Sequence, residues 1–174
     1  MTLEVLTDYF SKYGSIAIFV VVFLEYLNLP GFPAGIIMPL AGIMARQGRI
    51  HFLWVLFLSA VAAMLGSIVL YGIGVFFGKA FFHYYSKKSH KHQEKFEGYV
   101  NWIREKGYFG IFLAKLIPVF RTIISIPAGF LKLNFLKFCI ASVLGILIWN
   151  TAFIGAGYIY GDEIFEMIGK YLIK

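Results

Sequence analysis

The sequence contains few charged residues and a single cysteine. Only 14% of its 174 residues are Asp, Glu, Lys or Arg, whereas soluble domains carry about 25%. Cys139, the one cysteine, can form neither an internal disulfide nor a cysteine-based zinc site. The shortage of charge excludes an ordinary soluble domain, and it predicts an integral membrane protein with one domain, residues 1–174.

Catalytic and nucleotide-binding motifs are missing as well. The apolar segments contain no Ser/His/Asp order and no Cys–His pair, and the chain has neither GxGxxG nor GxxxxGK[ST]. A membrane hydrolase needs a nucleophile with its base, or paired acids, and none is evident in these segments. His90 and His92 flank Lys91 without a third ligand, so a solvated basic face is favoured over a metal site. We expect a protein that is not an enzyme and that has no cofactor and no metal.

What the chain does have is hydrophobic and basic residues. Hydrophobic residues make up 60%, the formal net charge is +7, and the mean hydropathy is +0.77. In a membrane protein such a charge fits cytoplasmic loops and anionic headgroups better than nucleic acid. We therefore expect membrane lipids as partners and no nucleic acid. The first residues lack the basic segment of a cleavable signal peptide.

The first quarter of the chain predicts two helices too short to cross a bilayer. Residues 2–13 have the pattern of an amphipathic surface helix, and 15–29 form an apolar helix of about 22 Å, short of the roughly 30 Å core. Pro30 and Pro33 then break the chain before a second short helix, about 36–45. We expect a re-entrant hairpin here; one long kinked span is the alternative.

The remaining chain predicts long spans that alternate with broken or amphipathic segments. A full span is expected at 52–82, followed by a basic connector at 83–107 whose second half is a surface helix. An apolar segment at 108–132 is broken at Pro118. A second full span at 135–160 and an amphipathic tail at 162–174 complete the chain.

Both halves of the chain follow one order of elements. Gly14 or Gly107 precedes an apolar run, a proline break follows, and a glycine-rich span comes last. The segments fall into repeat 1 (about 14–82), the connector (83–107), repeat 2 (about 108–161) and the tail (162–174). If each hairpin is re-entrant, each half crosses the membrane once and the second copy is inverted. The predicted fold is an all-α integral membrane protein with two inverted repeats, each a re-entrant hairpin plus a transmembrane helix, with amphipathic surface helices.

Three charges interrupt these apolar segments: Glu25, Lys115 and Arg121. A charge at the bilayer centre costs roughly 2.5–3.5 kcal/mol on insertion scales, so such residues are candidates for function. Arg121 follows the break at Pro118, where its guanidinium and the free amides of a helix N-terminus would favour a phosphate. Lys115 would bring a second cation to the same headgroup. The alternative for both is snorkelling to the membrane interface.

Glu25 snorkels poorly because its side chain is short. Inside lipid it would be neutral, paired with a cation such as Arg121, or exchanging protons, and it could also meet an ammonium headgroup. The alternative places it at a half-helix end at the interface. We predict a proton-coupling or counter-charge role for Glu25.

These segments resemble the DedA family, whose domain is also called VTT or SNARE-associated. The resemblance covers about 14–161 and rests on the following residues: Glu25, Pro30, Ala41, Gly42, Gly66, Tyr71 and Gly74 in the first half, and Phe112, Lys115, Pro118, Arg121, Thr122, Ala128, Gly129, Phe135, Gly145, Trp149, Gly157, Tyr158 and Gly161 in the second. Lys115 stands where Arg is usual in the family, and Ala34-Gly35 and Ser67 stand where many members carry acids.

The resemblance implies movement of lipids between leaflets of the bacterial cytoplasmic membrane. The lipid would be undecaprenyl phosphate or a phospholipid such as phosphatidylethanolamine, moved by a multi-pass flippase or scramblase. Two alternatives remain: a proton- or ion-coupled transporter of a small solute, and a non-transporting membrane-assembly protein. A homo-oligomer is compatible with the sequence.

Overall fold

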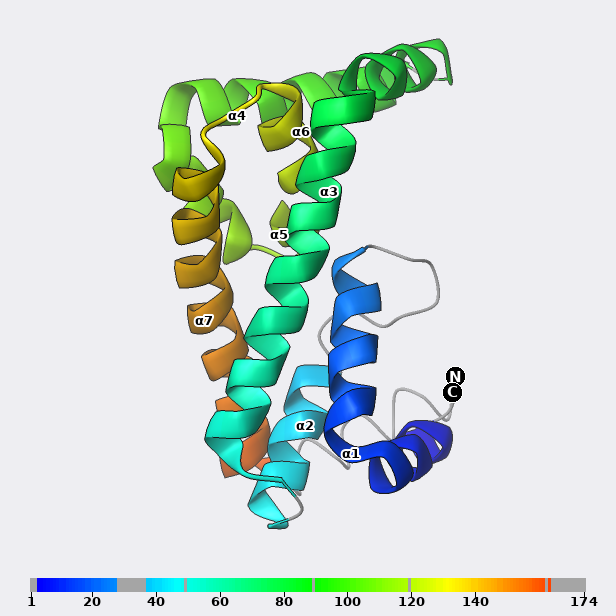
Figure 1. Cartoon of the computed structure of the whole chain (residues 1–174), viewed down its shortest axis with the longest axis vertical. Helices are drawn as coiled ribbons and strands as arrows, with labels where there is room; N and C mark the ends of the chain where they lie inside the picture. The colour runs from blue at the N-terminus through cyan, green and yellow to red at the C-terminus, as the bar shows by residue number, and fades with distance from the viewer. Residues whose placement is uncertain are drawn as a thin grey trace. The chain divides into compact units, whose positions relative to one another are not determined.

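Helices account for the regular structure of the chain in the part that the structure describes. This computed structural model describes residues 3–27, 37–48, 50–88, 90–118, 120–161 and Glu163. Its elements, shown in Figure 1, are α1 (Leu3–Tyr26), α2 (Ile37–Arg46), α3 (Phe52–Lys88), α4 (His90–Lys115), α5 (Phe120–Ile123), α6 (Ser125–Phe130) and α7 (Phe135–Ile159). Pro30, Pro33 and all of the predicted tail except Glu163 lie outside the described residues.

Two of these helices are long and apolar enough to cross a membrane. Phe52–Phe77 of α3 has 26 residues and a hydropathy of 2.4, and Phe135–Ile159 has 25 residues and a hydropathy of 1.9. At 1.5 Å per residue both reach about 38 Å, more than the roughly 30 Å hydrocarbon core. Gly14–Tyr26 and Ile37–Arg46 are apolar but shorter. The two predicted spans and the two short helices of the first half are confirmed as helices of these lengths.

Sharp kinks divide α1 and α4 where the sequence placed the starts of the two hairpins. Gly14 has φ 50° and ψ −123°, and Gly107 has φ 58° and ψ −141°. A residue with a side chain is strained in this region, whereas glycine adopts it readily. Figure 1 shows both helices bending. Each amphipathic segment therefore turns directly into an apolar arm without an intervening loop.

The helices cluster into two units. Unit 1 comprises Met1–Ala63 and Leu147–Lys174, and unit 2 comprises Met64–Ile146. In unit 1, α1 packs against α2, and Figure 1 shows their apolar parts side by side. In unit 2, α4 packs against both α5 and α6. Each unit thus contains one broken hairpin together with parts of the two long helices.

Unit 1 is held by a close backbone contact between α2 and α7. A Cβ added to Gly42 would lie 2.0 Å from the carbonyl oxygen of Ile154, and one added to Gly157 would lie 2.0 Å from that of Pro39. No side chain fits at either position, so two glycines facing each other let the backbones touch. Arg46 strengthens this pairing by donating a hydrogen bond of 3.1 Å to the carbonyl of Ile159, near the end of α7.

Unit 2 contains the same contact between α6 and α3. A Cβ on Gly129 would lie 2.0 Å from the carbonyl oxygen of Tyr71, and one on Gly74 would lie 2.1 Å from that of Ile126. In both units, the carbonyl oxygen that leaves no room for a Cβ belongs to the residue three positions before the glycine on the opposite helix. The second arm of each hairpin therefore packs on a long helix with the same local register.

The structure differs from the sequence prediction in two boundaries. The helix predicted at 52–82 extends to Lys88. The second arm of the later hairpin, predicted as one half-helix, is divided into α5 and α6 at Ile124. Pro127 explains the division, because proline has no N–H to donate to the carbonyl of Ile123 and its ring crowds that carbonyl.

Candidate functional site

Lys115 lies at the centre of unit 2 with its ammonium group directed at three acceptors. Its Nζ donates hydrogen bonds to Ser67 Oγ of α3 at 2.8 Å, to the carbonyl oxygen of Arg121 at 2.7 Å and to Ser125 Oγ of α6 at 3.0 Å. The residue is 0% exposed. An ammonium group has three hydrogens, so these three acceptors match its full donor capacity. Lys115 thereby ties the end of α4 to α3, α5 and α6.

The backbone around Lys115 explains how a lysine reaches this position. α4 ends at Lys115, and the chain turns through Leu116, whose N–H bonds the carbonyl of Leu113, and Ile117, whose N–H bonds that of Ala114. Pro118, which has no N–H, then prevents the helix from continuing. The interruption at Pro118 lies between α4 and α5. It leaves the lysine at a helix end, where its side chain can turn into the unit.

α7 supports the lysine from a further side. A Cβ on Gly145 would lie 2.5 Å from the Cβ of Lys115 and 2.9 Å from the carbonyl oxygen of Phe112, so only glycine allows this approach. The Lys115 Nζ also lies 5.9 Å from the centre of the Phe138 ring, within the range of a cation–π attraction. The lysine is therefore enclosed by packed helices.

Arg121 is buried beside Lys115, on the short helix α5. It is 2% exposed, and its carbonyl accepts one of the Lys115 hydrogen bonds. The structure thus brings together the two cations that the sequence singled out. The sequence predicted free backbone amides at this helix start, and this is wrong for the amides of Phe120 and Arg121. The Phe120 N–H donates to the carbonyl of Pro118 at 2.8 Å, and the Arg121 N–H donates to the carbonyl of Ile117 at 3.0 Å.

Glu25 belongs to unit 1, whereas Lys115 and Arg121 belong to unit 2. It is 4% exposed and lies one residue before the end of α1. Glu25 therefore lies at a helix end with its side chain buried. Both cations and the acid are therefore enclosed within the protein.

Sequence reasoning missed a second polar pair, Asn150 and Ser59, in unit 1. The Asn150 Nδ2 donates to Ser59 Oγ at 3.0 Å, and that hydroxyl donates to the carbonyl of Leu56 at 3.0 Å. The Oδ1 of Asn150 is buried and has no hydrogen-bond partner among the described residues. The sequence contained a signal for Asn150, because it occupies the position in the second half that corresponds to Ser67 in the first. The same spacing separates Phe52 from Phe135, Ser67 from Asn150 and Gly74 from Gly157.

The structure also brings a serine and a lysine together in one hairpin, which the sequence did not suggest. Ser125 and Lys115 have the contact distance of a Ser–Lys nucleophile and base. Ser125 is fully buried, as is Ser67. Within the described ranges, no group of three or more His, Cys, Asp or Glu side chains could hold a metal.

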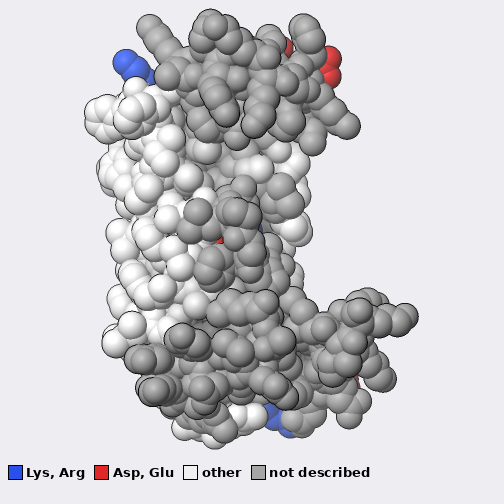
Figure 2. Space-filling model, turned by 90° about the vertical axis from the view of Figure 1, so that its right-hand side faces the viewer, with Lys and Arg blue, Asp and Glu red and all other residues white. Residues whose placement is uncertain are grey.

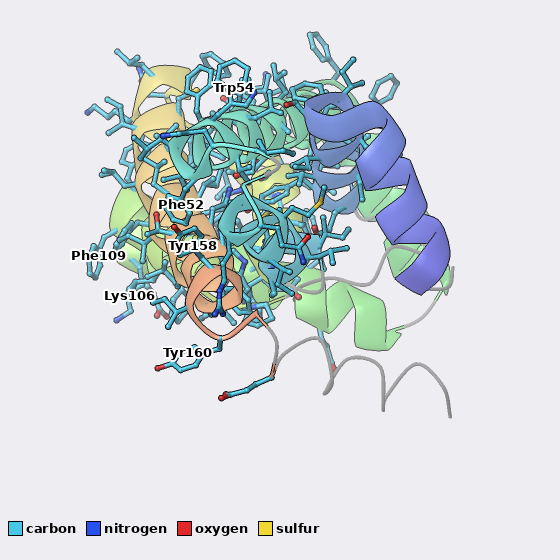
Figure 3. All side chains as sticks on the ribbon, turned by 90° about the horizontal axis from the view of Figure 1, so that it is seen from below. Phe52, Trp54, Lys106, Phe109, Tyr158 and Tyr160 are labelled. Carbon is cyan, nitrogen blue, oxygen red and sulfur yellow. The ribbon has the colours of Figure 1, made fainter. Side chains whose placement is uncertain are left out.

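The surface around these units is apolar. Large exposed hydrophobic side chains line both long helices, including Leu53, Phe57, Leu65, Val69 and Phe76 on α3 and Leu136, Ile140, Leu144 and Ile148 on α7. On the face in Figure 2, the described atoms are mostly white, with few from Lys, Arg, Asp or Glu. Figure 3 shows Phe52 and Tyr158 beside each other, with rings edge-on at 5.4 Å. Apolar surface of this extent is suited to lipid.

Comparison with known proteins gives a consistent result. The family profile of the VTT domain matches residues 32–159. The chain is 28% identical over 164 residues to the undecaprenyl phosphate transporter A of Staphylococcus aureus, covering 92% of this chain and 80% of that protein. It is 31% identical over 142 residues to the protein of the same name from Bacillus subtilis, covering 80% and 72%.

Another similar protein carries a different kind of name. An alkaline phosphatase-like protein of Lactococcus lactis is 26% identical over 174 residues, covering 97% of this chain and 80% of that protein. No solved structure matches the chain.

Proposed function

Because the chain belongs to the VTT domain family, also called DedA, we propose that this membrane protein moves a phosphate-bearing lipid between the leaflets of the bacterial cytoplasmic membrane. The substrate would be undecaprenyl phosphate or a phospholipid such as phosphatidylethanolamine. Relatives named undecaprenyl phosphate transporters support a lipid carrier. The observation that carries the proposal is the pair of buried cations, Lys115 and Arg121, at a broken helix between apolar arms.

The proposal includes two re-entrant hairpins in inverted repeats. Two kinds of observation support it: the apolar arms are too short to span, and each unit repeats the same glycine contact between a hairpin arm and a long helix. Broken helices near the middle of the membrane are typical of transporter substrate sites, because irregular backbone is tolerated there only around a cavity or inside protein. Opposed hairpins would shorten the apolar path that a headgroup must cross.

Within this scheme Arg121 is the direct phosphate contact. A guanidinium has five donors and forms paired hydrogen bonds with phosphate oxygens. The backbone carbonyl of Arg121 accepts a hydrogen bond from Lys115. Lys115 adds positive charge while its three hydrogens remain on protein acceptors. Glu25 is the proposed counter-charge or proton site. Neutralising Arg121 should therefore impair the lipid step itself.

Reconstitution in liposomes tests the proposal. Vesicles would contain either a labelled phosphatidylethanolamine or a labelled polyprenyl phosphate, and accessibility of the label to a membrane-impermeant reagent would report transbilayer movement. Loss of one charge-assisted hydrogen bond, roughly 1.5–3 kcal/mol, corresponds to about 10- to 150-fold in rate. We expect Arg121→Ala to slow movement by this factor, and Arg104→Ala, which removes an exposed arginine of α4, to leave it within about twofold.

A well-folded wild-type protein that moves neither lipid would overturn the proposal. Equal transport by wild type and Arg121→Ala would instead remove Arg121 from the mechanism. The two labels also separate the two candidate substrates, because only the transported lipid becomes accessible to the reagent.

We propose further that the protein is not an enzyme, despite the Ser125–Lys115 contact. The Lys115 ammonium donates a hydrogen to Ser125 Oγ, whereas a general base must accept the proton of its nucleophile. A fluorophosphonate reagent should leave the protein unlabelled in membranes, with a serine hydrolase in the same sample as the positive control. Stoichiometric labelling that disappears in Ser125→Ala would contradict this expectation.

A further inference from the structure

An apolar groove runs along unit 2 between the first arm of its hairpin and α7. Its volume is about 480 Å³, and its lining residues are Tyr108, Phe109 and Phe112 of α4, and Lys137, Ile140, Ala141 and Leu144 of α7. Of these seven, only Lys137 carries a charge, and Tyr108 contributes the one hydroxyl. The groove lies outside the Lys115–Arg121 site, since neither cation lines it.

The geometry of the two helices explains the groove. The α4 residues recur at one- and three-residue spacing and the α7 residues at three and four, so each set forms one stripe along its helix. Near one end, Gly145 brings the α7 backbone against Phe112 and Lys115. Near the other, the helices are held by the Tyr108 Oη, which accepts a 3.1 Å hydrogen bond from the N–H of Asn134. Between these two contacts the stripes face each other across open space.

A lysine marks the end of the groove nearest the start of α7. The Lys137 Nζ lies 5.7 Å from the centre of the Tyr108 ring, and the ammonium makes no hydrogen bond or ion pair among the described residues. A further exposed cation, Lys106, stands close by in sequence, two residues before Tyr108. Figure 3 shows Lys106 and Phe109 extending outward from α4. This end of the groove is therefore positively charged and the remainder is apolar.

Such a surface fits one kind of occupant. Phe109, Ile140 and Leu144 are exposed on helices of a membrane protein, so lipid chains contact them. Basic pockets between transmembrane helices bind anionic headgroups, and lysine near the end of a span lies at headgroup level. We propose that this α4–α7 groove binds an anionic phospholipid, with one acyl chain along the groove and the phosphate at Lys137. Binding requires only that the protein lie in a bilayer, and it does not depend on lipid movement through the Arg121 site.

Native mass spectrometry of the full chain tests the proposal. The protein would be released from vesicles of equal phosphatidylglycerol and phosphatidylethanolamine, and the retained lipids counted. Because one lysine near an anionic surface contributes about 1 kcal/mol, Lys137→Gln should weaken phosphatidylglycerol retention roughly fivefold. Lys132→Gln, which removes a neighbouring exposed lysine outside the groove, is the matched control and should retain the wild-type level.

A second variant tests the acyl-chain part. Ala141 forms the buried floor of the groove, and Ala141→Phe should displace both phosphatidylglycerol and phosphatidylethanolamine; Leu144→Trp serves if Ala141→Phe does not fold. Wild-type retention in Lys137→Gln and in the filled-groove variant would overturn the proposal. So would an equal loss in Lys132→Gln, or a lipid-free dimer, which would assign the groove to a second copy. Transport by Arg121 is measured separately, so failure here leaves the proposed function intact.

Discussion

The Lys115 ammonium donates a 2.8 Å hydrogen bond to the hydroxyl of Ser67, across 48 residues of sequence. The resemblance to the DedA family places Ser67 where many members carry an acid and Lys115 where arginine is usual. Both departures fall on one contact in the structure. The contact joins an ammonium to a neutral hydroxyl, with Ser125 and the Arg121 carbonyl completing the coordination.

The Lys115 contacts predict a large stability effect. Lys115→Met keeps the length and packing of the side chain but removes three hydrogen bonds from a charged donor. Each such bond contributes about 1.5–3 kcal/mol, and the serines can partly satisfy each other, so we expect a loss of roughly 3 kcal/mol. The unfolding midpoint in detergent measures it. Lys137→Met, at a lysine exposed on α7, should leave the midpoint within about two degrees.

The Ser67 contact predicts a conditional effect. Ser67→Asp alone places a carboxylate on the buried ammonium, and we expect a folded protein with near wild-type stability. Combined with Lys115→Met, the same aspartate loses its cation, and breaking a buried charge pair costs about 3–5 kcal/mol. A double-mutant cycle on unfolding free energies gives the coupling. Additive single effects would contradict direct pairing.

The glycine contacts predict which glycines are replaceable. Gly74→Ala would place a Cβ 2.1 Å from the Ile126 carbonyl, whereas a Cβ at Gly72 on the same helix meets nothing within 4 Å. Overpacking costs about 1–3 kcal/mol, while alanine in an open helical site gains up to about 1 kcal/mol over glycine. Thermal unfolding should therefore move down for Gly74→Ala and up for Gly72→Ala. The same sign for both would show that α3 and α6 do not touch here.

Neutralising Glu25 should reduce lipid transport without unfolding the protein. Glu25→Gln retains the shape of the side chain but removes its charge and replaces one acceptor oxygen with an NH2 donor. If Glu25 acts as counter-charge or proton site, lipid movement at neutral pH should fall at least about tenfold, the effect of about 1.4 kcal/mol. Glu105→Gln, at an exposed acid of α4, is the control. Wild-type transport by Glu25→Gln in liposomes would assign the residue a purely structural role.

Much of the fold could be predicted from the sequence because membrane helices depend on local composition. The runs beginning at Phe52 and Phe135 are apolar for longer than a bilayer requires, and glycines at 14 and 107 precede the two arms. The division of α5 from α6 was missed, although it too has a local cause, since Pro127 lacks the donor that a continuous helix needs. These features depend on a residue and its near neighbours in the chain.

The contacts of the site could not be predicted in the same way. Ser67 was recognised only as a missing acid, because its contact with Lys115 depends on how α3 packs beside the hairpin. Gly42 and Gly129 are among the residues that carry the family resemblance, but their partner carbonyls follow from helix register in space. The proposed charge pairing of Glu25 stays a prediction.

The paired glycines also restrict motion. Where Gly42 meets Ile154 and Gly129 meets Tyr71, backbone touches backbone, and such surfaces cannot slide without a steric clash. Each second arm must therefore travel with the segment of long helix beneath it as a rigid body. The amphipathic segments that precede Gly14 and Gly107 join their arms through single residues with positive φ angles, so glycine at these two positions sets the direction of each segment.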